Sequence, residues 1–201
     1  MAEVINGILI NEVETKNIMT KSSLPVGGYS VNPYVGCTHA CKYCYASFMK
    51  RFTGHKEEWG TFLDVKHWPE IKNPKKYAGQ RVVIGSVTDG YNPQEEQFRN
   101  TRKLLEQLIG SDADILICTK ADLVVRDIDL LKKLGRVTVS WSINTLDEDF
   151  KNDMDSASSI ERRIAAMKQV YDAGIRTVCF VSPVFPLSLI HILTLPTILR
   201  V

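Results

Sequence analysis

The sequence predicts an α/β fold built on a parallel sheet, and two observations indicate it. Short apolar runs of strand-like composition alternate with longer segments of helical periodicity, and the helical segments carry start signals and end at a glycine. Parallel strands need long crossover connections, usually helices, so this alternation is typical of a parallel sheet with right-handed crossovers. A plain doubly wound sheet would show the same alternation, so the pattern alone leaves the layout open.

Composition sets the class of protein. The 201 residues, 44% of them hydrophobic and 24% charged, are enough for one substantial core and too few for two domains. A formal net charge of +2 is too small to argue for nucleic acid or an anionic membrane surface. The N-terminus has no basic segment followed by a long apolar one, so we expect no secretory signal. Reduced cysteines without such a signal predict a cytoplasmic protein with no membrane contact.

The first part of the chain contains little regular pattern. Residues 1–28 are predicted to form an irregular lead-in, because one short apolar run is followed by a stretch rich in Ser, Pro and Gly. A first core strand is expected at 29–35, where β-branched and aromatic residues predominate. Gly36 provides a flexible joint after that strand. Residues 45–51 are expected to form a short helix.

The regular units begin at a buried strand expected at 81–87. Asn92 and Pro93 mark the start of the helix that follows, and Gly110 marks its end. Further strands are expected at 114–119, 136–143 and 176–181, and a further helix at 127–134.

The last predicted helix opens with a capping box, in which Ser158 is the N-cap and Glu161 its partner. Gly174 is its C-terminal stop. The apolar side chains expected to face inward from this helix are Ile164, Met167, Val170 and Tyr171.

Residues 187–201 differ from everything before them. They contain no acidic residue, one arginine and no regular periodicity, and they are too short to span a bilayer, which takes about 20 apolar residues. A sixth strand-helix unit is expected here and is missing. We therefore predict that the chain is truncated and that this apolar tail is non-native; the alternative is a native apolar strand.

Three cysteines organise the chain chemically. Cys37, Cys41 and Cys44 are spaced by three and then two residues in one loop after the first core strand. A 4Fe–4S cluster normally takes four cysteines, so three would leave one iron without a protein ligand. An open coordination position is typical of a reactive metal centre rather than a structural one.

Other interpretations of these cysteines remain open. Together with His39 or His55 they could form a structural zinc site in a non-catalytic zinc-binding or scaffold protein. A disulfide framework is disfavoured, because Cys118 and Cys179 lie in apolar strand-like runs.

The cysteine spacing, with an aromatic residue before the third cysteine, resembles the signature of radical S-adenosylmethionine (SAM) enzymes. The resemblance covers about residues 20–186 and is closest to the spore photoproduct lyase-like branch, and within it to the radical SAM mobile pair proteins. The segments that carry it are NPYVGCTHACKYCYA at 32–46, SVTDGYNPQE at 86–95, TK at 119–120, RD at 126–127 and SWSIN at 140–144. It implies a partial (β/α)6 barrel over residues 29–186, here truncated after about the fifth strand.

The resemblance also implies cofactors and their ligands. Cys37, Cys41 and Cys44 would hold a 4Fe–4S cluster whose open iron binds SAM, and reductive cleavage of SAM would yield a 5′-deoxyadenosyl radical. Tyr43 would lie beside the adenine. The polar residues that would contact the rest of SAM are Ser86, Thr88 and Asp89 at the second strand, for the amino group and ribose, and Ser142 and Asn144 at the fourth, for the ribose or carboxylate.

Each of these contacts has a simpler alternative. Thr88 and Asp89 are also suited to a turn before the helix at Asn92, and Ser142 and Asn144 are also suited to helix-capping before Asp147. Lys120 would face an anionic group, or only solvent. Repair lyases of this branch use an additional cysteine as hydrogen donor, for which Cys118 and Cys179 qualify by residue type, although buried free cysteine usually only packs.

The partners expected are an electron donor such as flavodoxin or ferredoxin, and a partner radical SAM protein. Nucleic acid is a third candidate, because basic and aromatic residues are mixed at 50–77, as on nucleic-acid surfaces. Acidic residues dilute the charge of that stretch, so an ordinary solvated face remains the alternative. The substrate is not specified by the sequence.

Overall fold

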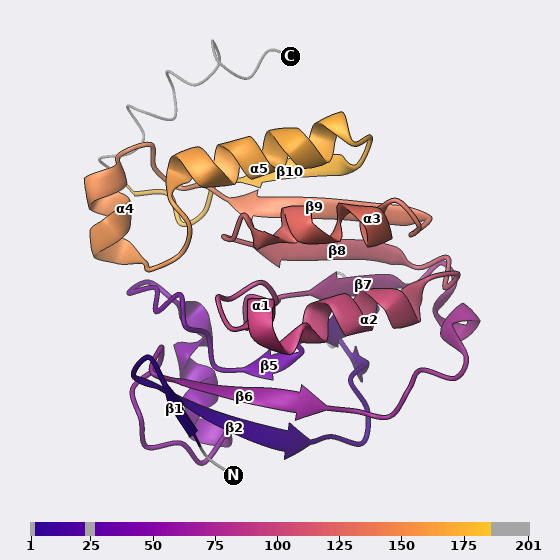
Figure 1. Cartoon of the computed structure of the whole chain (residues 1–201), viewed down its shortest axis with the longest axis horizontal. Helices are drawn as coiled ribbons and strands as arrows, with labels where there is room; N and C mark the ends of the chain where they lie inside the picture. The colour runs from indigo at the N-terminus through magenta and orange to yellow at the C-terminus, as the bar shows by residue number, and fades with distance from the viewer. Residues whose placement is uncertain (1–2, 23–26, 186–201) are drawn as a thin grey trace.

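A computed structural model describes residues 3–22 and 27–185, which form two sheets side by side (Figure 1). The larger sheet has the strand order β10-β9-β8-β7-β4-β3, and within it β4, β7, β8, β9 and β10 run parallel. Its strands are β3 (Thr20–Lys21), β4 (Tyr29–Val31), β7 (Arg81–Ile84), β8 (Asp114–Thr119), β9 (Arg136–Ser142) and β10 (Arg176–Phe180). The predicted parallel α/β fold is confirmed.

The second sheet lies below the first in Figure 1 and has the order β1-β2-β6-β5. Its strands are β1 (Glu3–Ile5), β2 (Ile8–Glu14), β5 (Tyr34–Val35) and β6 (Phe62–His67). The prediction of an irregular lead-in was therefore wrong for β1 and β2, which pair with each other and with β6. The sequence signal was weak because β2 contributes only one fully buried side chain, that of Ile10, which faces a small core.

The predicted strand at 29–35 is two strands in different sheets. β4 pairs with β7 in the larger sheet, whereas β5 pairs with β6 in the smaller one. Pro33, which separates them, has no N–H to donate to a ladder, and its carbonyl accepts a hydrogen bond of 3.1 Å from the Lys66 N–H. This break carries the chain from one sheet to the other directly before the cysteines.

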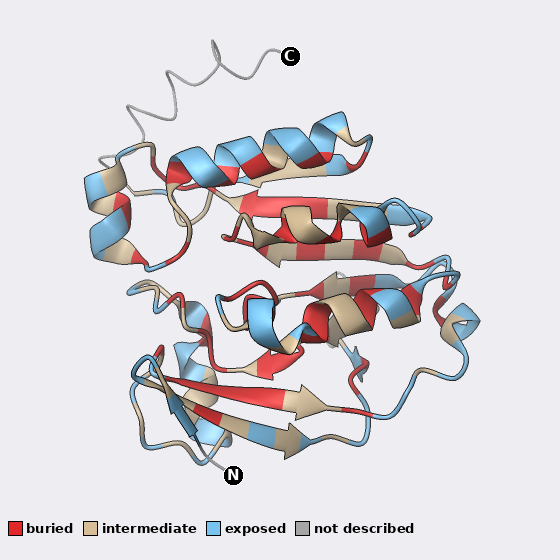
Figure 2. Cartoon of the chain, in the orientation of Figure 1, coloured by how far each residue is buried: buried red, intermediate tan, exposed pale blue. Residues whose placement is uncertain are grey.

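Helices cover one face of the larger sheet (Figure 1). The buried surfaces of strands and helices face one another across this layer (Figure 2), and the side chains between them form the main core, including Leu104, Ile117 and Trp141. The helices are α1 (Glu95–Phe98), α2 (Asn100–Leu108), α3 (Ile128–Leu131), α4 (Glu148–Met154) and α5 (Ile160–Asp172), with 3₁₀ helices η1 (Tyr45–Phe52), η2 (Pro74–Tyr77) and η3 (Leu123–Asp127).

The helix predicted after Asn92 is broken in two. Arg99 adopts a left-handed backbone conformation, with φ of 52°, between α1 and α2. The buried carboxylate of Glu95 accepts hydrogen bonds from the N–H groups of Thr101 (2.9 Å) and Arg102 (3.2 Å), so it satisfies the first turn of α2. Asn92 lies in the turn before α1 and is not its N-cap. Its Oδ1 accepts a hydrogen bond of 3.1 Å from the Gln94 N–H.

The helix predicted at 158–174 is α5, but its buried face differs from the prediction. Ser159, not Ser158, is the N-cap and accepts a hydrogen bond of 3.2 Å from the Arg162 N–H. Ile164 and Tyr171, which were expected to face inward, are exposed. The side chains of α5 that are buried are those of Ile160, Arg163, Ala166 and Val170.

Other segments match the predictions in part. Residues 127–134 contain the last residue of η3 and the short α3 rather than one helix. The helix whose capping was considered before Asp147 is α4, which has Asp147 as its N-cap. The predicted tail at 187–201 lies outside the described residues. Within the described ranges no helix has the length and apolar character needed to cross a membrane.

Candidate functional site

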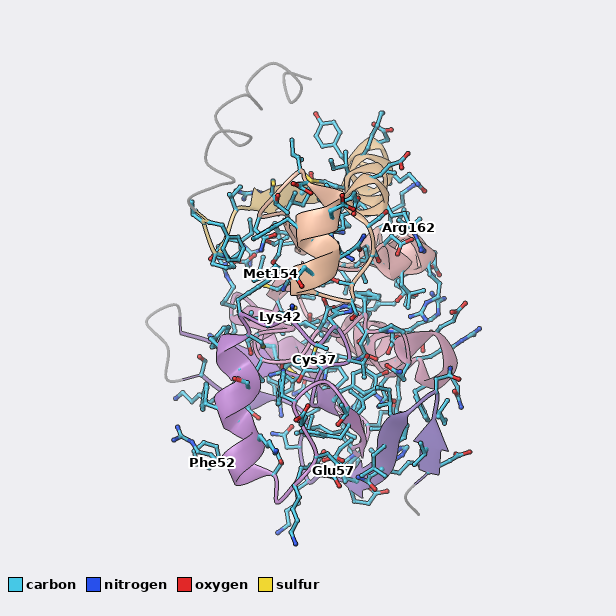
Figure 3. All side chains as sticks on the ribbon, turned by 90° about the vertical axis from the view of Figure 1, so that its left-hand side faces the viewer. Cys37, Lys42, Phe52, Glu57, Met154 and Arg162 are labelled. Atoms are coloured by element: carbon cyan, nitrogen blue, oxygen red, sulfur yellow. The ribbon has the colours of Figure 1, made fainter. Side chains whose placement is uncertain are left out.

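The carboxyl ends of β7, β8 and β9 meet at one edge of the larger sheet, on the left in Figure 1. Ligand sites of parallel α/β folds lie at this edge, because the loops that follow the strands converge there. The cysteine loop lies at the carboxyl ends of these strands. The predicted site residues Ser86, Thr88, Asp89, Ser142 and Asn144 lie there too. Figure 3 looks onto this edge and shows Cys37 and Lys42 in the middle of it.

The cysteine loop is shaped by close contacts between backbones. At Gly36, φ is +84°, and a Cβ would lie 2.4 Å from the Phe62 carbonyl oxygen, so only glycine fits. Ala40, between the first two cysteines, has φ of 48°. The loop turns through hydrogen bonds from the Ala40 N–H to the Cys37 carbonyl (3.2 Å) and from the Cys44 N–H to the Cys41 carbonyl (3.0 Å).

The end of α4 and the residues that follow it form hydrogen bonds with the cysteine loop. The Lys42 N–H donates to the Met154 carbonyl at 2.9 Å, and the Ser156 N–H donates to the His39 carbonyl at 2.8 Å. Figure 3 shows the same approach of Met154 at the end of α4 to Lys42. The third contact is made by side chains, since the Tyr43 hydroxyl donates to Asp155 Oδ2 at 3.1 Å.

Arg163 fixes Asp155 in turn. The guanidinium is fully buried and forms an ion pair of 2.7 Å with Asp155 Oδ1. It also donates to the carbonyls of Ser142 at 3.1 Å and Ser158 at 2.8 Å. A single buried cation therefore links the end of β9, the start of α5 and, through Asp155, the ring of Tyr43. The sequence contains no signal for this link, because Arg163 lies on an ordinary amphipathic helix.

Asp89 is held by four groups at the mouth of the sheet. Its Oδ1 accepts from the Tyr91 N–H (2.9 Å) and the Thr119 hydroxyl (2.9 Å), and its Oδ2 accepts from the Lys120 N–H (2.7 Å). Oδ2 also lies 3.1 Å from His39 Nε2. Burial raises the pKa of Asp89, but His39 and the backbone donors outweigh it and lower the pKa to about 2. The turn role expected for Asp89 is thus realised in full.

Ser86 and Thr88 lie beside the first core strand. Ser86 Oγ is 2.5 Å from Ser30 Oγ and accepts from Asn32 Nδ2 at 3.2 Å. Asn32 Oδ1 accepts from the backbone N–H of Val87 (3.1 Å) and of Thr88 (3.3 Å), so one asparagine orders the whole turn. A hollow of about 260 Å³ opens next to these residues and reaches the cysteine loop at Gly36.

Ser142 and Asn144, the two SAM contacts predicted at the fourth core strand, differ in their place relative to the end of that strand. Ser142 is the last residue of β9, and Asn144 follows two residues later and is buried. Asn144 Nδ2 has no hydrogen-bond partner among the described residues, although it lies near the Tyr43 hydroxyl. The Tyr43 hydroxyl is the nearby polar group for this buried amide, so Asn144 and Tyr43 form one polar pair beside the cysteine loop. Both ring nitrogens of His39 are likewise buried without a hydrogen bond in the described part of the chain, although Nε2 lies 3.1 Å from Asp89 Oδ2.

Burial favours the protonated thiol at Cys37 and at Cys41. Burial raises the pKa of Cys37 to about 12 and that of Cys41 to about 11; at Cys41 the nearby Lys120 partly opposes the effect. Metal binding would release these protons, because the thiolate is the ligand. Three cysteines on one ordered loop, next to buried polar atoms without partners, fit the donor set of a 4Fe–4S cluster with an open iron.

The zinc interpretation needs His39 or His55 as a fourth ligand. Both histidines face carboxylates instead. His39 pairs with Asp89, and His55 lies between Glu57 and Asp64, at 3.0 Å from each carboxylate.

The two remaining cysteines lie on opposite faces of the larger sheet. Cys118 pairs in register with Ser140 on the face turned away from the helices, and its charge would influence Tyr45 across the mouth of the site. Cys179 pairs with Trp141 and packs against the helix-covered core. Burial raises the pKa of both thiols, that of Cys118 to about 11. As candidate hydrogen donors, Cys118 and Cys179 could not be distinguished by residue type alone.

A second hollow in the protein surface lies away from the cysteine loop. A hollow of about 540 Å³ lies at the amino ends of β8, β9 and β10, against Asp114, Arg136 and Arg176. These ends are opposite to the carboxyl ends that carry the cysteine loop. The site therefore comprises the smaller hollow, the loop and the strand ends beside it.

Sequence comparisons identify a family model and relatives of the chain. A family model described as the radical SAM superfamily matches residues 31–193. The chain is 38% identical to an uncharacterized protein of Methanocaldococcus jannaschii over 89% of this chain and 69% of the relative. It is 32% identical to an uncharacterized protein of Acidianus two-tailed virus over 79% of this chain and 56% of the relative. A radical SAM Nalpha-GlyT isomerase of Pseudomonas phage M6 is 26% identical, over 83% of this chain and 34% of the relative.

Solved structures share the fold. A spore photoproduct lyase complexed with dinucleoside spore photoproduct superposes with a TM-score of 0.68 at 19% identity, over 88% of this chain and 52% of that one. A variant of the same enzyme with bound AdoMet superposes with a TM-score of 0.67, at 19% identity over 87% of this chain and 51% of that one. The chain thus spans about half the length of these structures.

Proposed function

The chain belongs to the radical SAM superfamily, and we accordingly propose that it binds a 4Fe–4S cluster through Cys37, Cys41 and Cys44 and SAM across the adjoining strand ends. Membership implies SAM cleavage and radical chemistry at an iron–sulfur cluster. When bound and reduced, such a cluster supplies the electron that cleaves SAM to a 5′-deoxyadenosyl radical. The observation that carries the assignment is the three-cysteine loop, ordered on both sides at the carboxyl edge of the sheet.

The chain's own residues would bind and orient SAM. Tyr43, oriented by Asp155, offers a ring for the adenine, and its hydroxyl lies near the unpartnered amide of Asn144. Ser86, Thr88 and Ser142 offer hydroxyl and backbone groups to the ribose and the methionine moiety. The Lys120 ammonium lies 5.7 Å from the centre of the Tyr43 ring and suits the methionine carboxylate.

We propose a supporting role for Asp89. A carboxylate has about four acceptor positions, and here three hydrogen bonds and the contact with His39 occupy them. Direct contact with the SAM ammonium would have to displace one of these groups. Asp89 therefore acts on SAM by holding His39 and the turn at Thr88.

For the substrate we propose a nucleotide unit of a nucleic acid. The solved structures that share the fold of this chain include a lyase complexed with dinucleoside spore photoproduct, and that complex supports a nucleotide as the kind of substrate proposed here. An electron donor such as flavodoxin or ferredoxin would reduce the cluster. A partner radical SAM protein would be compatible with β10, which is the terminal strand of its sheet among the described residues.

Anaerobic reconstitution with iron and sulfide tests the proposal. We expect about four irons and four sulfides per chain, and 5′-deoxyadenosine and methionine after reduction with dithionite in the presence of SAM. Cys118→Ser is the control, because it changes a thiol outside the loop. A colourless protein that takes up one zinc ion per chain and no iron would instead identify the zinc-binding scaffold.

A further inference from the structure

The outer surface of η1 is unusual for a segment next to a buried site. Among the described residues nine large hydrophobic side chains are exposed, and three of them, Tyr45, Phe48 and Phe52, lie within the eight residues of η1. Their exposed fractions are 68%, 44% and 69%. Figure 3 shows η1 along the outside of the molecule, with Phe52 at the end farther from Cys37. Aromatic rings gathered on an exposed surface indicate a binding partner.

The sequence around η1 carries only positive charge. No acidic residue occurs between Glu14 and Glu57, whereas six basic residues do. They are Lys16, Lys21, Lys42, Lys50, Arg51 and Lys56, of which Lys42 is paired with Asp153. The Arg51 guanidinium lies over the rings of Phe48 (5.3 Å) and Phe52 (4.9 Å), and Lys50 Nζ donates to the Lys56 carbonyl at 2.9 Å. Neither Lys50 nor Arg51 forms an ion pair with another described side chain.

The surface leads to the candidate site. Tyr45 is the first residue of η1 and directly follows Cys44, and its hydroxyl donates a hydrogen bond to the Ser86 carbonyl at the mouth of the sheet. Eight residues of 3₁₀ helix rise about 2.0 Å each, so η1 is roughly 16 Å long. A nucleic-acid strand lying along it from Phe52 to Tyr45 would arrive at the proposed SAM site.

We propose that η1 is a stacking platform for single-stranded nucleic acid and delivers a nucleotide to the mouth of the site. A polyanion with flat bases complements both features, since phosphates pair with basic side chains and bases stack on aromatic rings. A stable protein partner needs about 800 Å² on each side, more than three rings on a short helix provide. This inference rests on the proposed nucleotide substrate and places its binding surface on the chain.

Fluorescence anisotropy with a labelled ten-nucleotide single-stranded DNA tests the platform on the full chain. Phe52→Ala and Arg51→Glu are expected to weaken binding by roughly 5- to 100-fold, because one stacked base contributes strongly to affinity. Arg51→Glu is also expected to reduce the salt dependence of log K by about 0.7 for each phosphate that is no longer neutralised. Phe52→Tyr keeps a ring and should retain binding. Tyr171→Ala on α5 and Lys75→Glu on η2, both exposed and remote, are matched controls that should bind normally.

The outcomes separate this inference from the proposed function. Unchanged DNA affinity in both Phe52→Ala and Arg51→Glu would overturn the platform, as would variants that lose affinity for an added flavodoxin but not for DNA. A chain that cleaves SAM but does not bind DNA contradicts the platform alone. A chain that binds DNA through η1 but assembles no cluster contradicts the proposed enzyme and leaves the platform intact.

Discussion

The hydroxyl of Tyr43 donates a hydrogen bond of 3.1 Å to Asp155, a residue 112 positions later in the sequence. Asp155 is in turn paired with the buried Arg163 at 2.7 Å. Tyr43, directly before the third cysteine, is therefore oriented through Asp155 by Arg163 of α5. Because Arg163 also binds the Ser142 carbonyl, the cysteine loop and the end of β9 share one support.

Asp155→Asn should destabilise the protein by about 2 kcal/mol, because hydrogen bonds to charged groups contribute more than neutral ones and Arg163 would remain buried without its counter-ion. Urea unfolding measures the loss. Asp153→Asn is the matched control, since its pair with Lys42 is exposed at both ends and is worth at most about 1 kcal/mol. Equal stability losses in the two variants would mean that the buried pair has no special role.

Tyr43→Phe should leave iron content unchanged and weaken SAM binding several-fold. The change removes one hydrogen bond, worth about 1 kcal/mol, but leaves the thiols and the Asp155–Arg163 pair in place. The electron paramagnetic resonance spectrum of the reduced cluster, recorded with and without SAM, reports binding independently of turnover. Identical SAM titrations for Tyr43→Phe and wild type would argue against a position beside the adenine.

Replacing any one of Cys37, Cys41 and Cys44 by Ala should abolish cluster assembly, whereas Cys118→Ala and Cys179→Ala should retain it. Only the first three lie on the loop held by Met154 and Ser156. Iron and sulfide analysis after anaerobic reconstitution decides the matter. Comparable iron loss in all five variants would contradict this ligand set.

Asp89→Ala should impair both the cysteine loop and SAM binding, because Asp89 contacts His39 from the loop as well as Thr119. Asp89→Asn keeps the shape and part of the hydrogen bonding, so it should retain more iron than Asp89→Ala. Iron content and SAM affinity are measured on the same samples. A variant with full iron content that binds no SAM would instead place Asp89 in direct contact with SAM.

His55 should make stability depend on pH. Burial lowers the pKa of His55, but its contacts with Asp64 and Glu57 outweigh burial and raise the pKa above the usual value. A histidine with a raised folded-state pKa contributes stability fully below its unfolded pKa of about 6.5 and loses that contribution as pH rises through the folded value. The difference in unfolding free energy between wild type and His55→Gln should therefore be largest near about pH 5.5 and shrink toward about pH 9.

Glu57→Gln provides the control for that experiment. It removes one of the two carboxylates that face His55, so it should flatten the pH dependence without abolishing it. A difference between wild type and His55→Gln that stays constant with pH would show that stacking on Phe62, rather than charge, is what His55 contributes.

Local pattern was sufficient to predict the parallel α/β fold, the cysteine loop and the strand ends beside it. Cysteine spacing and strand-helix alternation are properties of neighbouring residues, so they can be read from short segments of sequence. The resemblance to radical SAM enzymes, and not the local pattern, pointed to Ser86, Thr88, Asp89, Ser142 and Asn144. These residues follow parallel strands, which present their carboxyl ends on the same side of the sheet. The same local signals misjudged 29–35, since a strand-like run does not reveal which sheet each part joins.

Tertiary structure alone decided which residues support the site. Cys118 and Cys179 both lie in strands, but register with Ser140 and Trp141 put them on opposite faces, and register depends on pairing between distant strands. Arg163 lies on the helix α5, and Asp155 and two carbonyls satisfy its guanidinium in the interior. A buried charge is tolerable only where its partners are assembled, and those partners come from segments that only folding brings together.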